Sequence, residues 1–205
     1  MIQNVVDAVQ RILRERRSPM LVAIDGRSGA GKSTLAEALA IATSGIIIPS
    51  DDFFAAEITS AEWDTRNSEE RARDAIDWRR LRAEALEPLL AGRDASWFPF
   101  DFAAGPMPNG AYRIATELTR RTPAPVLILD GAYSTRPELA DLVDLTVLIE
   151  TAASVRLRRL ADRESPELLA SWHARWDAAE DYYFAHVRPQ SAFDLIVDYS
   201  SAAHQ

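Results

Sequence analysis

One glycine-rich segment constrains the fold of this 205-residue chain more than any other feature. The segment, DGRSGAGKST at positions 25–34, follows an apolar run at positions 20–24 and leads into a helical pattern over residues 33–42. A short, continuous apolar run is typical of a parallel strand that is buried on both faces. The order of strand, glycine-rich turn and helix therefore predicts an α/β protein built on a parallel sheet.

Residues 26–33 of this segment fit the pattern G-x-x-x-x-G-K-[ST], which cradles the phosphates of a nucleotide. The glycines let successive backbone N–H groups point at one phosphate, and the start of the following helix adds partial positive charge. Lys32 would reach the β and γ phosphates, and the Ser33 hydroxyl would bind Mg²⁺. We predict that a nucleotide and Mg²⁺ bind here, at Gly26, Arg27, Ser28, Gly29, Ala30, Gly31, Lys32, Ser33 and Thr34. The expected nucleotide is ATP, and a preference for GTP stays open. For Arg27, a solvated position on the loop is the alternative.

Apolar runs and helical patterns alternate along the rest of the chain. They predict strands at 46–48, 126–129, 145–149 and 193–198, and helices at 2–17, 77–90, 152–163 and 166–186. We expect a three-layer P-loop NTPase fold with a mostly parallel sheet and a small helical lid. The aromatic, proline-rich and glycine-rich stretch 95–113 predicts short strands and loops, whereas the polar stretch 51–75 predicts no element.

The length predicts one domain over residues 1–205. Its core would comprise about 18–50 and 124–200. Insertions at about 51–115 and 154–170 would carry the site of a second ligand and the lid.

The composition excludes several classes of function. A hydrophobic content of 47% excludes disorder throughout, and the absence of cysteine excludes disulfides, thiolate metal sites and a cysteine nucleophile. With 23 basic against 31 acidic residues, the net charge of −8 argues against a generic nucleic-acid binder. The sequence contains no apolar stretch long enough to predict a membrane span, and charges such as Arg11 and Arg14 interrupt any signal-peptide core. We expect a cytoplasmic protein that acts on a small molecule, and a homo-oligomer stays open.

Two carboxylates are expected beside the glycine-rich loop because each follows an apolar run. Asp51, in the sequence Ser50-Asp51-Asp52-Phe53-Phe54, could approach Mg²⁺ and accept the proton of a hydroxyl that attacks the γ-phosphate. Asp130 ends the run 126–129 in the Walker-B arrangement and could hold the metal directly or through water. The predicted metal site therefore comprises Ser33, Asp51 and Asp130. For either aspartate the alternative is an ordinary turn or helix cap at a strand end.

A set of arginines lies on the predicted helix 152–163. Arg156, Arg159 and Arg163 share one face because they are three and four residues apart. Such a face could close over the phosphates and neutralise developing charge. The alternative is a solvated basic face that pairs with Asp162 and Glu164.

These motifs together resemble the uridine kinase and nicotinamide riboside kinase group of P-loop kinases. The resemblance rests on residues 25–33 and on five further segments, Asp51-Asp52-Phe53-Phe54, Phe98-Pro99-Phe100-Asp101-Phe102, Asp130-Gly131, Arg156–Arg163 and Phe193–Asp198. It covers roughly residues 20–198, and only the phosphate-loop part is strongly specific. It implies an ATP-dependent and Mg²⁺-dependent kinase that phosphorylates a hydroxyl of a nucleoside or sugar-like acceptor.

The resemblance also implies roles for particular residues. Lys32, Asp51, Arg159 and Arg163 would be catalytic, with Asp51 as the general base and the two arginines on the lid. Asp77 would grip vicinal hydroxyls of the acceptor, with a helix N-cap before Trp78 as its alternative. The residues expected to contact the acceptor are Asp52, Phe53, Asp77, Phe100, Asp101 and Tyr133.

The acceptor stays open between a nucleoside and a sugar. Pyrimidine kinases of this group carry a base-reading histidine after the segment that ends here at Phe102, and this chain continues with Ala103-Ala104-Gly105-Pro106 instead. Farther along, Trp172, Trp176 and Tyr183 share one face of the last predicted helix, where core packing is the expected role over base stacking.

Other functions of a phosphate-binding loop are also open. A nucleotide-dependent switch or NTPase is one alternative, although the guanine-reading Asn-Lys-x-Asp segment of GTPases is absent from the sequence. A non-catalytic ATP-binding protein is the other. Lys32, Ser33, Asp51 and Asp130 occur together, which favours the kinase.

Overall fold

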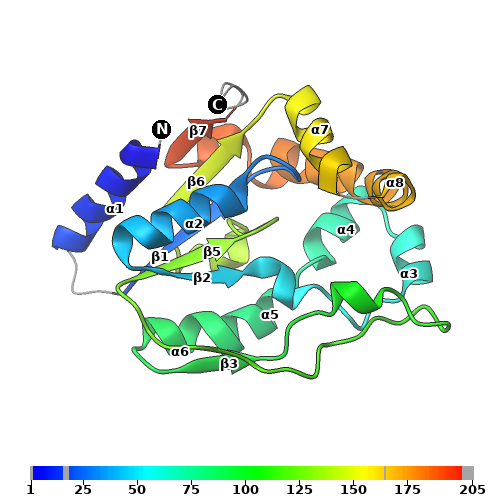
Figure 1. Ribbon diagram of the computed structural model, residues 1–205, viewed down its shortest axis with the longest axis horizontal. Helices are drawn as coiled ribbons and strands as arrows, with labels where there is room; N and C mark the ends of the chain where they lie inside the picture. Colours follow the sequence, from blue (N-terminus) through cyan, green and yellow to red (C-terminus); the bar gives the residue numbers. More distant parts are fainter. Residues whose placement is uncertain (1, 16–18, 164, 200–205) are drawn as a thin grey trace.

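Five parallel strands form the central sheet in the order β2-β5-β1-β6-β7 (Figure 1). The computed structural model describes residues 2–15, 19–163 and 165–199, without the side chains of 166–172 and 174. The strands are β1 (Met20–Asp25), β2 (Ile46–Pro49), β5 (Val126–Asp130), β6 (Leu145–Glu150) and β7 (Leu195–Asp198). All five predicted strands are confirmed. Because β1 lies in the middle, the glycine-rich loop emerges at the centre of the carboxyl edge, where ligands bind in such sheets.

A separate hydrophobic core covers each face of the sheet. Successive residues of a strand point to opposite faces, so Leu21 of β1 belongs to one core and Val22 to the other. The Val22 face is covered by α1 (Ile2–Glu15) and α2 (Lys32–Thr43). With helices also packed on the opposite face, the predicted three-layer α/β fold is confirmed.

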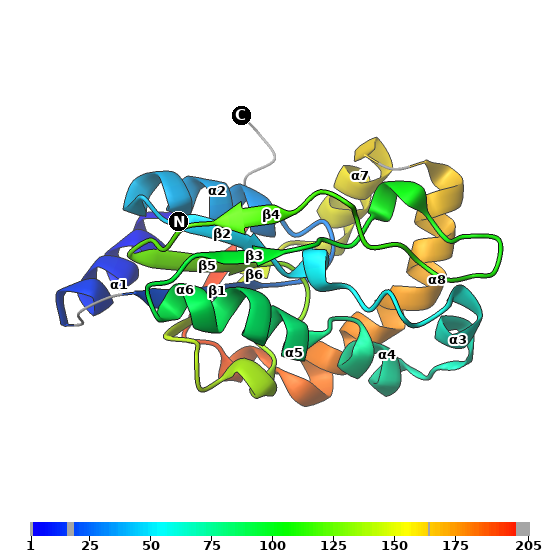
Figure 2. The same ribbon diagram turned by 90° about the horizontal axis from the view of Figure 1, so that it is seen from below.

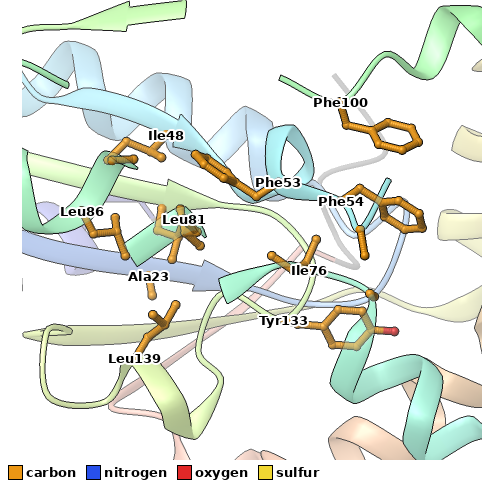
Figure 3. Close-up of a cluster of buried hydrophobic side chains, with 14 of the residues drawn as sticks. Ala23, Ile48, Phe53, Phe54, Ile76, Leu81, Leu86, Phe100, Tyr133 and Leu139 are labelled. Carbon is orange, nitrogen blue, oxygen red and sulfur yellow. The ribbon is translucent and has the colours of Figure 1, made fainter. Parts of the chain in front are cut away.

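The opposite face carries a core built mainly from the chain between β2 and β5 (Figure 3). This part of the chain contains four short helices, α3 (Ser60–Thr65), α4 (Ser68–Asp74), α5 (Trp78–Leu81) and α6 (Glu87–Leu90). Figure 2 shows α5 and α6 on the side of the sheet away from α2. The same part of the chain also contains the antiparallel strands β3 (Ala95–Trp97) and β4 (Thr119–Arg121).

The stretch 51–75, for which the sequence analysis predicted no element, contains α3 and α4. Both helices begin with a capping box, in which the cap side chain and a glutamate three residues later bond each other's backbone N–H groups. The pairs are Thr59 with Glu62 and Asn67 with Glu70. These helices were missed because their few apolar residues give no clear period.

The predicted helix 77–90 is present but is not a regular α-helix. A π-helical turn, Arg82–Leu86, separates α5 from α6, and the N–H of Glu87 donates to the carbonyl oxygen of Arg82. Pro88 follows directly, and a proline inside an α-helix lacks one donor and clashes with the carbonyl four residues earlier. The wider turn therefore lets the helical path continue past the proline.

Two helices near the C-terminus lie beyond the carboxyl edge of the sheet, α7 (Ala153–Arg163) and α8 (Pro166–Tyr182). A second π-helical turn, Tyr183–Val187, continues α8. Short 3-10 turns occur at Ser50–Phe53, Phe102–Ala104, Pro137–Leu139 and Gln190–Ala192. Within the described part of the chain, no helix is long and apolar enough to cross a membrane.

Candidate active site

The glycine-rich loop joins β1 to α2 in a conformation that L-residues rarely adopt. Gly29 has φ +76° and Gly31 has φ +105°. A Cβ atom on Gly29 would lie 2.8 Å from the carbonyl oxygen of Arg156, so α7 can approach the loop only because position 29 has no side chain. The loop ends at the N-terminus of α2, whose free N–H groups and dipole favour an anion.

Lys32, the first residue of α2, folds its side chain back along the loop. Its Nζ donates to the carbonyl oxygens of Gly26 at 2.8 Å and Arg27 at 3.2 Å. Its charge also acts on the two predicted carboxylates, lowering the pKa of both Asp51 and Asp130 against the effect of burial. The ammonium group therefore lies where loop and carboxylates meet.

Asp130, at the end of β5, lies next to the loop because β5 pairs with β1, with Asp130 opposite Ile24. Burial raises the pKa of Asp130, and a hydrogen bond from the Ser33 side chain opposes this shift. No donor among the described residues reaches its buried Oδ1 atom. A carboxyl oxygen without a partner beside a serine hydroxyl fits Mg²⁺, which prefers oxygen ligands.

The residues that could hold Mg²⁺ are few. No group of three or more His, Cys, Asp or Glu side chains forms a metal-binding cluster in the part of the chain that the structure describes. Mg²⁺ is usually bound by one or two carboxylates together with phosphate oxygens and water, so Asp51, Asp130 and the Ser33 hydroxyl are the candidate ligands from the protein.

Asp51 reaches the same place from β2, through the 3-10 turn that follows it. Gly131 makes this approach possible, since a Cβ atom there would lie 2.0 Å from Ser50 Oγ and 3.2 Å from Asp51 Oδ1. The Asp51 carboxyl is open to the water of a cavity yet enclosed by protein. This enclosure raises its pKa to about 6, with Lys32 lowering it and the charge of Asp130 raising it.

The lid arginines contact the loop directly. Arg156 donates to the carbonyl oxygen of Ser28 at 2.9 Å, and Arg159 donates to those of Gly29 at 3.3 Å and Ala30 at 3.1 Å. Arg163 lines the cavity, and its charge lowers the pKa of Asp51. Arg156 and Arg159 therefore face the loop rather than forming a solvated basic face.

Apart from Arg156, the charged side chains described above line one cavity of about 850 Å³, near the upper end of the range for small-molecule sites. One part, which we call the phosphate half, is formed by the loop with Lys32, Ser33, Asp51 and Asp130. The other part, which we call the aromatic half, is formed by Phe54, Ile76, Phe102, Tyr133 and Trp176. The cavity thus offers a polar, cation-bearing region beside a flat apolar one.

Most of the predicted nucleotide-binding residues line this cavity, namely Ser28, Gly29, Gly31, Lys32, Ser33 and Thr34. Gly26 and Ala30 are buried within the loop. Arg27 does not line the cavity, because its guanidinium pairs with Asp181 at 2.6 Å and lies over the ring of Phe184. In this structure Arg27 therefore contacts α8 and the turn after it, and its contact with nucleotide stays a prediction.

Of the six residues expected to contact the acceptor, Tyr133 alone lines the cavity. Phe53 is fully buried and packs on Trp97, whereas the next residue, Phe54, turns toward the cavity (Figure 3). Phe100 is likewise buried behind Phe102, which lines the cavity. From these two aromatic segments the residues that line the cavity are Phe54 and Phe102, each next to or near a predicted residue.

The three predicted acidic contacts, Asp52, Asp77 and Asp101, have hydrogen-bond partners within the protein. Asp52 accepts a hydrogen bond from Trp97 Nε1 at 2.7 Å. Asp77 caps the N-terminus of α5 by accepting from the N–H of Arg80, which was its alternative role. Asp101 accepts from the N–H of Ala104 at 3.0 Å and caps a 3-10 turn. None of the three lines the cavity.

Helix α8 supplies contacts that the sequence analysis did not predict. Trp176 is buried as expected for core packing, but its ring also lines the cavity, and Glu180, one turn later, lines it too. Tyr183 donates a hydrogen bond to the buried Asp25 at 3.0 Å. The side chain of Trp172 lies outside the described residues. The only available signal was the spacing of four between Trp176 and Glu180.

Tyr133 adopts a backbone conformation that is uncommon for a bulky residue, with φ +59°. Burial raises the pKa of its hydroxyl well above the ordinary value, and the charge of Glu180 acts in the same direction. Residues in such conformations cluster at functional sites, where the surrounding structure holds them. Tyr133 therefore presents a neutral hydroxyl and a fixed ring.

Comparison with known proteins was made at the levels of sequence and structure. No protein-family model matches the chain. A curated uridine kinase from Halobacterium salinarum is 28% identical over 177 residues, which cover 82% of this chain and 71% of the relative.

Two solved structures share the fold. A protein from Bacillus stearothermophilus, described as a possible uridine kinase, has a TM-score of 0.64 and 18% identity and covers 95% of this chain and 100% of its own. A protein from Silicibacter sp. TM1040, provisionally described as a fructose transport system kinase, has a TM-score of 0.66 and 20% identity, with coverage of 94% and 98%. The fold class inferred from the sequence is thereby confirmed.

Proposed function

Because the chain is a uridine kinase-like P-loop kinase, we propose that it transfers the γ-phosphoryl group of ATP to a hydroxyl of a nucleoside or sugar-like acceptor. The observation that carries this proposal is the shared cavity, in which Asp51 and the glycine-rich loop adjoin an aromatic wall. ATP would bind with its phosphates on the loop, and the acceptor would occupy the aromatic half. The two halves would then hold the reacting groups side by side.

Asp51 would orient the acceptor hydroxyl and take its proton late in the transfer. A carboxylate with a pKa near 6 is mostly ionised at neutral pH and still a stronger base than an ordinary aspartate. Little covalent chemistry is required of the protein in phosphoryl transfer, so positioning and charge supply most of the rate.

Cationic groups around the loop would stabilise the charge on the transferred phosphoryl group. Lys32 would release its loop carbonyls for phosphate oxygens, and Arg159 and Arg163 would act from the lid. Ser33, Asp130 and Asp51 would hold Mg²⁺, which neutralises phosphate charge when it is bound. The unpartnered Oδ1 of Asp130 supports this assignment.

The test is the release of ADP from ATP with and without candidate acceptors, including uridine, cytidine, nicotinamide riboside, ribose and fructose. We expect release to be strongly stimulated by at least one acceptor, and ³¹P NMR to show a new phosphate ester. ADP release at a rate that no acceptor changes would instead indicate an NTPase or switch. ATP binding without turnover would indicate a non-catalytic protein.

A further inference from the structure

A buried carboxylate, that of Glu180 on α8, lines the cavity where its two halves meet. The residue is 4% exposed. It bonds Ser28 of the glycine-rich loop, and its charge helps to raise the pKa of the Tyr133 hydroxyl in the aromatic half. Trp176, one helical turn earlier, is part of the aromatic wall. Glu180 is therefore close to both ligands of the proposed reaction.

The hydrogen bonds of Glu180 use only part of its capacity. Its Oε1 atom accepts from Ser28 Oγ at 2.6 Å and from the Ser28 N–H at 3.0 Å, and its Oε2 atom makes only a 3.3 Å contact with the same N–H. An ionised carboxyl group can accept about four hydrogen bonds. Oε2 is thus available to a donor in the cavity.

No lysine or arginine of the described residues forms an ion pair with Glu180. The nearby Arg27 pairs with Asp181 instead, on the outer side of the helix. A buried charge is costly unless a partner compensates it, and the two donors of Ser28 are neutral. A ligand that brings a donor or a positive charge to Oε2 would remove part of this cost.

From this geometry we propose that Glu180 determines acceptor specificity by binding a hydrogen-bond donor of the acceptor, either a hydroxyl or an ammonium group. The proposal rests on the proposed function and adds the chemical class of the acceptor. Acceptors with a donor at this position would bind well, because hydrogen bonds to an ionised carboxyl group are the stronger kind. Acceptors with a carboxylate or phosphate there would be rejected by like charge.

The test compares sets of matched acceptors with the wild-type protein and with Glu180→Gln. One set is uridine, 5-(aminomethyl)uridine and the anionic 5-(carboxymethyl)uridine, and the other is fructose, 1-amino-1-deoxyfructose and 2-ketogluconate. Within the set that the wild-type protein phosphorylates, we expect kcat/KM for the anionic acceptor to be about 10-fold to 100-fold lower than kcat/KM for the neutral acceptor. In Glu180→Gln this difference should shrink to about 3-fold or less, an order-of-magnitude expectation for loss of the charge.

The glutamine variant keeps the contact with the loop, because its amide oxygen can still accept from both donors of Ser28. Isothermal titration of ATP should therefore give a Kd within about twofold of wild type, which separates specificity from damage to the loop. Asp177→Asn is the matched control, since it removes an exposed negative charge from the same helix, three residues away. It should leave the ranking of acceptors unchanged.

The outcomes separate this proposal from the proposed function. Equal loss of kcat/KM for all members in Glu180→Gln, or a wild-type protein that does not discriminate by charge, would overturn the role of Glu180. If no acceptor is phosphorylated, the same sets are tested by isothermal titration. Binding that discriminates by charge and loses this property in Glu180→Gln would support the role of Glu180 while the kinase assignment fails.

Discussion

The two halves of the cavity are built in different ways. The phosphate half comes from short stretches of sequence at the ends of three neighbouring strands, β1, β2 and β5, and it uses backbone groups together with Lys32 and two aspartates. The aromatic half comes from side chains of five segments spread along the chain, with Phe54, Ile76, Phe102, Tyr133 and Trp176 as its members. A phosphate site can be specified locally, whereas an acceptor site depends on how remote segments pack.

This contrast leads to four predictions, of which the first concerns Asp51 in the phosphate half. Asp51→Asn should lower kcat by about 10²-fold to 10⁴-fold, since the amide cannot take the proton of the acceptor. The thermal midpoint Tm should change little, because the amide is close to the carboxyl group in size. Wild-type turnover in the purified variant would exclude Asp51 as the base.

The second prediction concerns Gly131, where the variant Gly131→Ala tests whether the phosphate half depends on the close approach of the segments that follow β2 and β5. Gly131→Ala would place a Cβ atom 2.0 Å from Ser50 Oγ and would strain a φ of +141°. A displacement of Asp51 by a fraction of an ångström should lower kcat by about 10-fold to 100-fold. Gly92→Ala is the control, because its φ of +71° is also strained but nothing lies within 4 Å of the added atom. Both variants should lose stability, by roughly 1–3 kcal/mol, but only Gly131→Ala should lose activity.

The pH dependence should also report the phosphate half. In the proposed mechanism the ionised form of Asp51 is the base, so kcat/KM should reach its full value well above the Asp51 pKa of about 6 and should decline as the pH falls through that pKa. At pH 5 we expect kcat/KM to be about tenfold lower than its full value. We use kcat/KM because its pH dependence reports the pKa of the protein without bound substrate. A profile that stays flat from pH 7 to pH 5 would contradict this assignment.

The smallest expected effect concerns the aromatic half. Phe102→Ala should raise the KM of the acceptor by about 3-fold to 10-fold and leave the KM of ATP unchanged, because a half-exposed ring contributes modestly to binding. Phe98→Ala removes a ring of similar exposure that does not line the cavity and should change neither constant. Equal effects of the two variants would mean that Phe102 does not contact the acceptor.

The same contrast explains what the sequence could predict. The strands were predictable because each is a continuous apolar run, and Asp51 and Asp130 were found because carboxyl ends of parallel strands share one edge. Which of Phe53 and Phe54 lines the cavity was not predictable, because the 3-10 turn at residues 50–53 decides which ring points into the core and which into the cavity. Glu180 was missed because it is about 150 residues away from Ser28, its partner in the loop.

Helix α8 joins the two halves of the cavity. Within a single turn it presents Trp176 to the aromatic half and Glu180 to the loop. A shift of α8 would therefore move one residue of each half at the same time. If ATP and the acceptor are coupled through this helix, thermodynamic linkage requires each to alter the affinity for the other by the same factor.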